Sequence, residues 1–183
     1  MAALANESVL WLVWPGDKLC PSRFHKLTRM QIRLATLSDL PAAAQLWFDR
    51  ITLLQQTDPR IRLLPDARGN WSAAAARWAS DDRTGFWVAE DCGTLLGFAV
   101  ARIATGEPGL QPQRRGVLLE MVVDLHETHR GLADQLLDRV RQWLAARGAG
   151  EIEVDVPARY PVEAAFWRGQ GGAACSERFR LTL

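Results

Sequence analysis

The stretch LLEMVVDLHETHRGLADQLL, residues 118–137, decides the fold of this 183-residue chain. The run Leu118–Val123 is apolar except for Glu120, which is typical of a central strand with apolar neighbours on both faces. From Leu132 onward, leucine or valine recurs every four residues as far as Leu144, which predicts an amphipathic helix. A regular strand over 115–124 would place Val117, Leu119, Met121 and Val123 on one face and Leu118, Glu120 and Val122 on the other.

The loop between this strand and helix has the features of an anion site. A strand–loop–helix unit turns backbone N–H groups toward one point, and the helix N-terminus adds unsatisfied amides and the positive end of its dipole. Gly131 removes a side chain where a phosphate would approach the backbone, and Ala133 keeps the first turn thin. His129 and Arg130 add positive charge. The residues alone leave two interpretations open: a pyrophosphate cradle, or a plain turn in which Gly131 relieves backbone strain.

The flanking sequence predicts a mixed sheet with helices, in the order β-α-α-β-β-β-α-β-α-β. Thr36 lies three residues before Asp39, which favours a helix start. Asn70 is expected to cap a second helix, and Asp91-Cys-Gly93 to form a hairpin turn. Further strands are expected over 32–34, 86–90, 95–104, 152–156 and 179–183, and a last helix over 161–167.

The first 29 residues lack the periodicity of the remainder. Met30 opens an alternating Met-Gln-Ile-Arg-Leu pattern, so the domain is expected to span residues 30–183. Residues 1–29 are then either an extension upstream of a natural start at Met30 or an N-terminal arm that packs on the domain.

Composition excludes several classes of protein. The chain has 22 basic and 21 acidic residues without a basic stripe, which argues against a nucleic-acid partner. Its apolar runs are too short for a membrane span, and three scattered cysteines favour a cytoplasmic location. His126 and His129 lie in a loop rather than on a metal-binding helix, so no metal is expected.

Thr128-His-Arg-Gly-Leu-Ala133 resembles the acetyl-CoA signature of the GCN5-related N-acetyltransferase (GNAT) family, Arg/Gln-x-x-Gly-x-Gly/Ala. The preceding Glu-Met-Val-Val-Asp resembles the fourth strand of that family, and residues 31–183 follow its element order nearly throughout. The resemblance implies a GNAT-like acyl-CoA N-acyltransferase fold in which acetyl-CoA sits where the fourth and fifth strands part. It also implies a transferase that moves an acetyl group from acetyl-CoA, its co-substrate, to a small-molecule or peptide amine. Members of the family often pair, so a homodimer is one option.

By this resemblance, the fourth strand holds the pantetheine arm of acetyl-CoA and the loop holds its pyrophosphate. The implied binding residues are Met121, Val122, Val123, Thr128, His129, Arg130, Gly131, Leu132 and Ala133.

Two positions depart from the family pattern. Thr128 replaces arginine or glutamine, although amides supply most phosphate contacts. Trp167 stands where a tyrosine often protonates the departing thiolate, and Tyr160 lies about two turns away. A non-catalytic acyl-CoA-binding module is therefore the alternative function.

Glu120 is the candidate catalytic base. Burial between apolar neighbours would raise its pKa toward neutrality, which suits a group that accepts a proton from an amine. The alternative is a glutamate that pairs with an arginine and organises the sheet. Asp155 is a second candidate, expected to face solvent instead. Trp47, Trp71 and Trp78 are expected to pack in the core, and an aromatic wall for the acceptor is the other interpretation.

Overall fold

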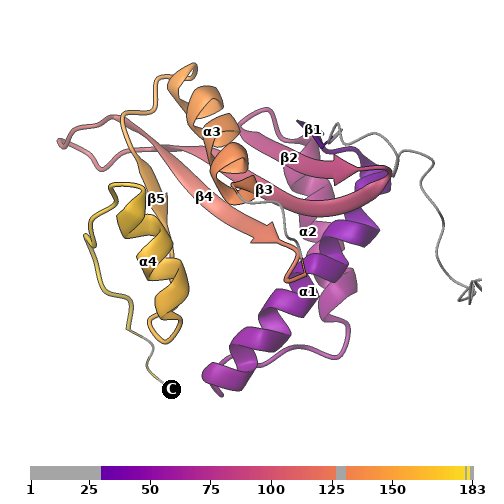
Figure 1. The fold of residues 1–183 in the computed structure, drawn as a ribbon. Helices are drawn as coiled ribbons and strands as arrows, with labels where there is room; N and C mark the ends of the chain where they lie inside the picture. Colours follow the sequence, from indigo (N-terminus) through magenta and orange to yellow (C-terminus); the bar gives the residue numbers. More distant parts are fainter. Residues whose placement is uncertain (1–29, 127–130, 180, 182–183) are drawn as a thin grey trace, which may run out of the picture.

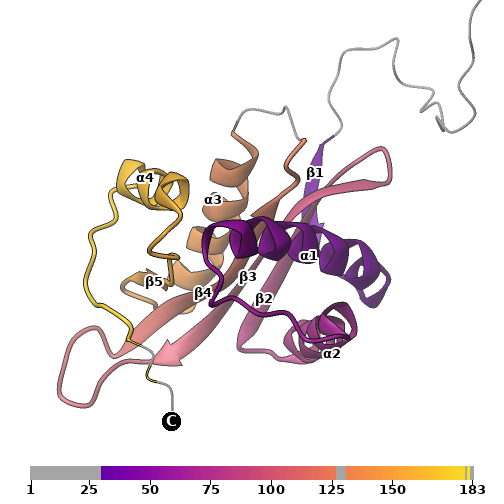
Figure 2. The same cartoon turned by 90° about the horizontal axis from the view of Figure 1, so that it is seen from below.

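The computed structural model describes residues 30–126, 131–179 and 181. Its centre is a five-stranded sheet with strands in the order β1-β2-β3-β4-β5. Helices α1 and α2 cover one face of the sheet and α3 covers the other, while α4 lies beside β5 (Figures 1 and 2). The elements are β1 Gln31–Leu34, a 3-10 turn Leu37–Asp39, α1 Leu40–Thr57, α2 Ala67–Ser80, β2 Thr84–Asp91, β3 Thr94–Thr105, β4 Arg114–Val123, α3 Leu132–Ala145, β5 Ile152–Val154 and α4 Pro161–Gly169.

The sheet is mixed, as predicted. Strands β1 to β4 pair in antiparallel fashion, and β5 pairs with β4 in parallel after the crossover through α3. The β2–β3 hairpin turns at Cys92 and Gly93, with φ values of 49° and 78°, as a two-residue turn of the primed type requires. The predicted strand at 179–183 is wrong for its described residues. Phe179 and Leu181 belong to no strand, and their exposed fractions of 78% and 85% leave them without a sheet to pack on.

The start of α1 follows the predicted capping chemistry. The Thr36 backbone N–H donates to Asp39 Oδ2 at 2.7 Å, and the Thr36 hydroxyl donates to the same oxygen at 2.8 Å. Arg33 binds the same carboxylate through two bonds of 2.7 Å, so the pKa of Asp39 lies well below its usual range. This contact fixes the path from β1 into α1, and Pro41 occupies the first turn as expected.

The predicted cap of α2 is wrong. The helix begins at Ala67 rather than after Asn70, and Asp66 caps it by accepting a bond of 3.3 Å from the Gly69 N–H. Asp66 offers the same kind of oxygen four residues earlier, so Asn70 lies inside the helix.

Strand β4 contains a bulge that changes which side chains share a face. Val100 pairs with Glu120 and Ala101 with Leu118, so Leu119 is the extra residue. Leu118 packs with Met121 and Val123 toward α3, whereas Leu119 packs toward α1 and α2. The regular alternation predicted for this strand is therefore wrong at Leu118 and Leu119.

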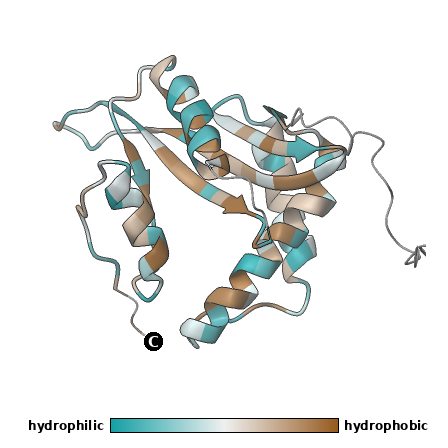
Figure 3. Cartoon of the chain, viewed as in Figure 1, coloured by the Kyte–Doolittle hydropathy of each residue, from teal (hydrophilic) through white to brown (hydrophobic). Residues whose placement is uncertain are grey.

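Two apolar clusters lie on opposite faces of the sheet, and apolar residues recur along β3 and β4 (Figure 3). The cluster under α1 and α2 contains Trp71, which stacks on Trp47 at 5.7 Å between ring centroids and meets Trp78 edge-on at 5.9 Å. These three tryptophans pack in the core, as expected. The other cluster holds the buried leucines and valine of α3 against β3 and β4. Within the described ranges, no helix combines the length and apolarity needed to cross a membrane.

Candidate active site

A cleft opens where β4 and β5 separate. The two strands pair only from Gly116 to Leu118 on β4 and from Ile152 to Val154 on β5, and Figure 1 shows them diverging beyond that point. The cleft has a volume of about 770 Å³. Its floor is β4, one wall is α1 with the loop that follows, and the other wall is formed by β5 and α4, with Ala133 of α3 at its edge.

The bulge in β4 determines which backbone groups face this cleft. The Gly116 N–H bonds to Glu151 on the β5 side, whereas the Asp124 N–H bonds to Leu96 on the β3 side. Backbone groups alternate along a strand, so counting back from Asp124 directs the N–H and C=O groups of Met121 and Val123 away from β3. The side chains of both residues line the cleft as well. Val122 is only 3% exposed and packs under α1 and α2.

The N-terminus of α3 lies beside the cleft. Gly131 precedes the helix with a φ of 85°, a left-handed conformation that favours glycine. Leu132 is 1% exposed and anchors the first turn in the core, while Ala133 lines the cleft. The predicted binding residues Thr128, His129 and Arg130 lie outside the described residues.

Glu120 lies on the floor of the cleft, with 19% of its side chain exposed. Burial raises its pKa from 4.5 to about 7. The guanidinium of Arg50 and the indole N–H groups of Trp47 and Trp71 lower the Glu120 pKa and so limit the rise, while Glu163 adds to it. The carboxyl group is therefore balanced between its neutral and ionised forms near neutral pH, as its mid-strand position predicts.

Arg50 connects three elements across the cleft. Its Nη2 and Nε atoms donate to Glu163 Oε1 on α4 at 2.5 and 3.0 Å. Its Nη1 atom lies 4.0 Å from Glu120 Oε2. Glu120 is thus desolvated, as expected for a base, and also faces an arginine, as expected for a glutamate that organises the sheet. Sequence reasoning missed Arg50 and Glu163, since nothing local in either helix links residues 113 positions apart.

Trp71 adds a polar atom to this region. Its Nε1 atom is buried and makes no regular hydrogen bond within the described part of the chain. Its influence on the Glu120 pKa shows that the N–H is close enough to favour the ionised carboxylate. Trp47, Trp71 and Trp78 all remain outside the described lining of the cleft.

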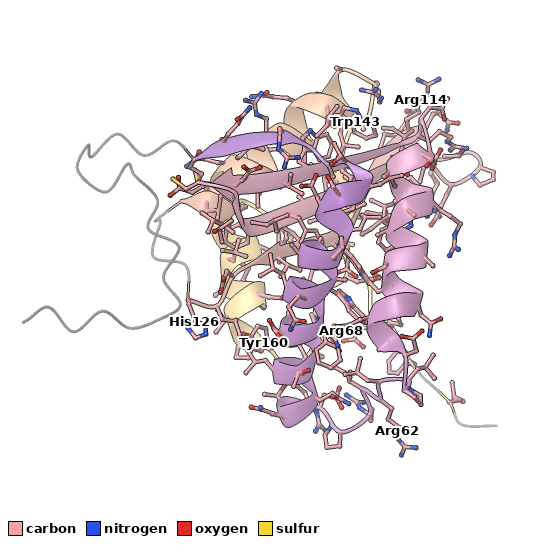
Figure 4. The ribbon with its side chains drawn as sticks, turned by 90° about the vertical axis from the view of Figure 1, so that its right-hand side faces the viewer. Arg62, Arg68, Arg114, His126, Trp143 and Tyr160 are labelled. Carbon is pink, nitrogen blue, oxygen red and sulfur yellow. The ribbon has the colours of Figure 1, made fainter. Side chains whose placement is uncertain are left out.

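The other predicted candidates take different places. Trp167 lines the cleft from α4. Tyr160 precedes α4, is not part of the described cleft lining, and appears at the base of that helix in Figure 4. Asp155 lies at the rim, where Arg178 pairs with it at 2.5 Å and 74% of its side chain is exposed, as expected. Among the residues that the structure covers, no group of three or more potential metal ligands is found, and His126 is exposed.

Comparison with known proteins gives a consistent assignment. Residues 48–171 match the family model described as "Acetyltransferase (GNAT) family". A search of curated proteins gives no match. The fold is similar to that of aminoglycoside N-acetyltransferase AAC(6')-Iy in complex with CoA, at 20% identity and a TM-score of 0.66, over 85% of this chain and 95% of that one.

Two further structures share the fold. A predicted acetyltransferase with acetyl-CoA from Clostridium acetobutylicum has 18% identity and a TM-score of 0.64, over 84% of this chain and 96% of that one. A transcriptional regulator from Bacillus halodurans C-125 has 19% identity and a TM-score of 0.69, over 84% and 99%. These likenesses concern the fold, because the identities are low and one fold supports many functions.

Proposed function

This chain belongs to the acetyltransferase (GNAT) family, and we propose that it transfers an acetyl group from acetyl-CoA to a primary amine. The observation that carries the proposal is the cleft between β4 and β5, which has a desolvated carboxyl group on its floor and a helix N-terminus at its edge. The CoA and acetyl-CoA complexes of the similar structures agree with it.

The residues of the cleft suit a bound acyl-CoA. Gly131 and Ala133 leave the start of α3 without bulky side chains, so a pyrophosphate can reach the helix amides. The backbone groups of Met121 and Val123 are free of β3 and can pair with the amides of a pantetheine arm. Val122 would contribute through its position in the strand only, because its side chain is buried on the other face.

Acetyl-CoA would supply the acetyl group as a thioester. Glu120 is the proposed base: it accepts a proton from the acceptor ammonium, directly or through water, and so frees the lone pair that attacks. The new C–N bond replaces the C–S bond, the nitrogen releases its second proton to water, and a strand N–H of Met121 or Val123 stabilises the negative charge on the carbonyl oxygen.

The leaving thiolate needs a proton from another source. Trp167 occupies the wall where a tyrosine would serve, and an indole N–H is a poor acid. Water is the proposed donor, which lowers the rate without abolishing it, because a positioned acid typically contributes about 10²–10⁴-fold.

The test is release of free thiol from acetyl-CoA with a panel of primary amines. The wild-type protein should release thiol with at least one amine, and Glu120→Gln should reduce kcat by about 10²–10⁴-fold while CoA still binds. Equal rates in the two proteins would remove Glu120 from this role.

Trp167 on the cleft wall favours one alternative, a module that binds acyl-CoA without turnover. Calorimetric binding of acetyl-CoA with no thiol release for any amine would support this alternative over catalysis. Absence of CoA binding would reject both.

A further inference from the structure

The two walls of the cleft differ in chemistry. The wall made by β5 and α4 carries Trp167, which the proposed function places near the departing thiolate, and the inference below rests on that function. The opposite wall belongs to α1 and the loop after it, and its apolar lining is formed by Ile51, Leu54 and Ile61. An acceptor that reaches Glu120 from this side meets these aliphatic side chains together with the arginines of the same wall, Arg50, Arg60 and Arg62.

Each carboxylate in the described lining of the cleft lies beside an arginine. Glu163 pairs with Arg50 at 2.5 Å, and Glu120 lies 4.0 Å from the same guanidinium. Asp155 at the rim pairs with Arg178 at 2.5 Å. A ligand with several positive charges binds well where carboxylates lack a cationic partner. In the described lining of this cleft, each carboxylate already has an arginine beside it.

Arg50 also places a fixed positive charge inside the cleft. Only 19% of its side chain is exposed, and two hydrogen bonds to Glu163 hold its position. Like charges brought together in a desolvated site repel strongly. One ammonium can be accepted beside Glu120, which takes its proton, but a second ammonium finds Glu163 and Asp155 already paired with Arg50 and Arg178.

We propose that the acceptor of this enzyme is an amine with a single positive charge on an apolar body, and that Arg50 excludes acceptors with several positive charges. Arg50 is thus a specificity-determining residue. The proposal separates this chain from the aminoglycoside N-acetyltransferases that share its fold.

Hexylamine and 1,6-diaminohexane test this proposal, because they share an alkyl chain and differ by one terminal ammonium. Thiol release at pH 8 should give hexylamine a kcat/KM about tenfold or more above that of the diamine, the factor that corresponds to about 1.4 kcal/mol. Arg50→Gln should reduce this ratio to near one. Arg68→Gln is the control, because Arg68 is an exposed arginine that donates to Gln45 on α1 and lies outside the described cleft lining; its ratio should stay that of wild type.

A second variant tests the charge without removing the arginine. Glu163→Gln leaves Arg50 uncompensated and should raise the preference for hexylamine above that of wild type. Binding is measured in parallel by titrating each amine against the intrinsic fluorescence of the tryptophans near Glu120, in the presence of CoA.

The outcomes distinguish the two proposals. Equal or better use of the diamine by wild type, an unchanged ratio in Arg50→Gln, or no binding of either amine would overturn the assignment of the acceptor. Preferential binding of hexylamine without thiol release would support this assignment and would count against acetyl transfer.

Discussion

At the residue scale, the carboxyl group of Glu120 is subject to opposing influences. Burial and Glu163 raise its pKa while Arg50 lowers it, and the balance of these influences lies at about 7. Glu163 and Arg50 come from α4 and α1, so either can be changed without altering β4, the strand that carries the base. The proposed base can therefore be tested by changing its neighbours.

Changing Arg50 and changing Glu163 should move the acid limb of the pH profile of kcat/KM in opposite directions. The base acts when ionised, so kcat/KM should fall as the pH drops through about 7, and about tenfold per pH unit well below that value. Arg50→Gln removes a group that lowers the Glu120 pKa, so the limb should move to higher pH. Glu163→Gln removes a group that raises this pKa, so the limb should move to lower pH.

The pH dependence of kcat/KM for one amine and acetyl-CoA, measured for both variants and wild type, checks this pair. The Arg68→Gln protein serves again as control. Shifts of the same sign in both variants would contradict the electrostatic account of Glu120.

Glu120 should also reduce the stability of the folded protein at alkaline pH. Its folded pKa of about 7 exceeds the ordinary value of 4.5, so between these values the folded state binds the extra proton and stability falls as the pH rises. The penalty is absent below 4.5 and complete above about 7. The free energy of unfolding of Glu120→Gln should therefore exceed that of wild type by about 1–3 kcal/mol at pH 8. At pH 4 the two proteins should have nearly the same free energy of unfolding.

Denaturant unfolding of both proteins at the two pH values measures this difference. The pKa of Asp39 is lowered by Arg33, so its contribution is lost at acid pH in both proteins alike and cancels in the comparison. A stabilisation that is larger at pH 4 than at pH 8 would refute the burial of an ionisable Glu120.

At the element scale, the loop-to-helix junction before α3 depends on one left-handed residue. Gly131 has a φ of 85°, and among the residues that the structure describes a Cβ there would meet Asp134 Oδ2 alone, at 3.9 Å. Space is thus available, and the barrier to substitution is the backbone conformation itself. This junction sets the start of α3, whose Ala133 lines the cleft, so its geometry matters for the proposed phosphate site as well as for stability.

Gly131→Ala should therefore weaken CoA binding as well as lower stability. Gly93→Ala provides a matched control, because Gly93 has a φ of 78° and open space in the β2–β3 turn. Each substitution should cost about 1–2 kcal/mol of unfolding free energy. Calorimetry should show a higher Kd for CoA in Gly131→Ala only. Equal Kd values in the two variants would argue against a phosphate site at this junction.

At the scale of the whole molecule, the sheet separates two apolar clusters, and α3 ties the junction of β4 and β5 to the second cluster. Packing is tight at Gly116, where an added Cβ would lie 2.3 Å from Leu144 Cδ1. Leu144 is 1% exposed and cannot move aside easily. By contrast, none of the α4 residues Pro161–Gly169 is fully buried. Arg50 donates to Glu163 of this helix, Trp167 packs against the second cluster, and Gln170 at its end donates to Asp134.

Gly116→Ala should lower the unfolding free energy by about 1–3 kcal/mol, because it overpacks this contact. Leu144→Ala alone should lower it by about 2–5 kcal/mol through the cavity that it leaves. The double variant should be more stable than the sum of the two effects predicts, because the added methyl enters space that the leucine vacates. Denaturant unfolding of all four proteins measures the coupling, and strict additivity would contradict the contact.

Local patterns in the sequence determined the elements and several of their ends. The four-residue repeat of α3, the capping pair Thr36 and Asp39, and the apolar run around Glu120 each depend on neighbours within a few positions, so periodicity predicts them. The same run predicted that Glu120 would be desolvated. The cap of α2 was predicted wrongly because two residues of suitable chemistry, Asp66 and Asn70, lie one turn apart.

Only the tertiary structure decided how the strands register and which distant side chains meet. The bulge at Leu119 arises from the pairing of β4 with β3, and it turns the backbone of Met121 and Val123 toward the cleft. The contact of Arg50 with Glu163 and Glu120 arises because α1 and α4 face each other across that cleft. Such features depend on pairing and packing between segments far apart in the chain, where periodicity carries no information.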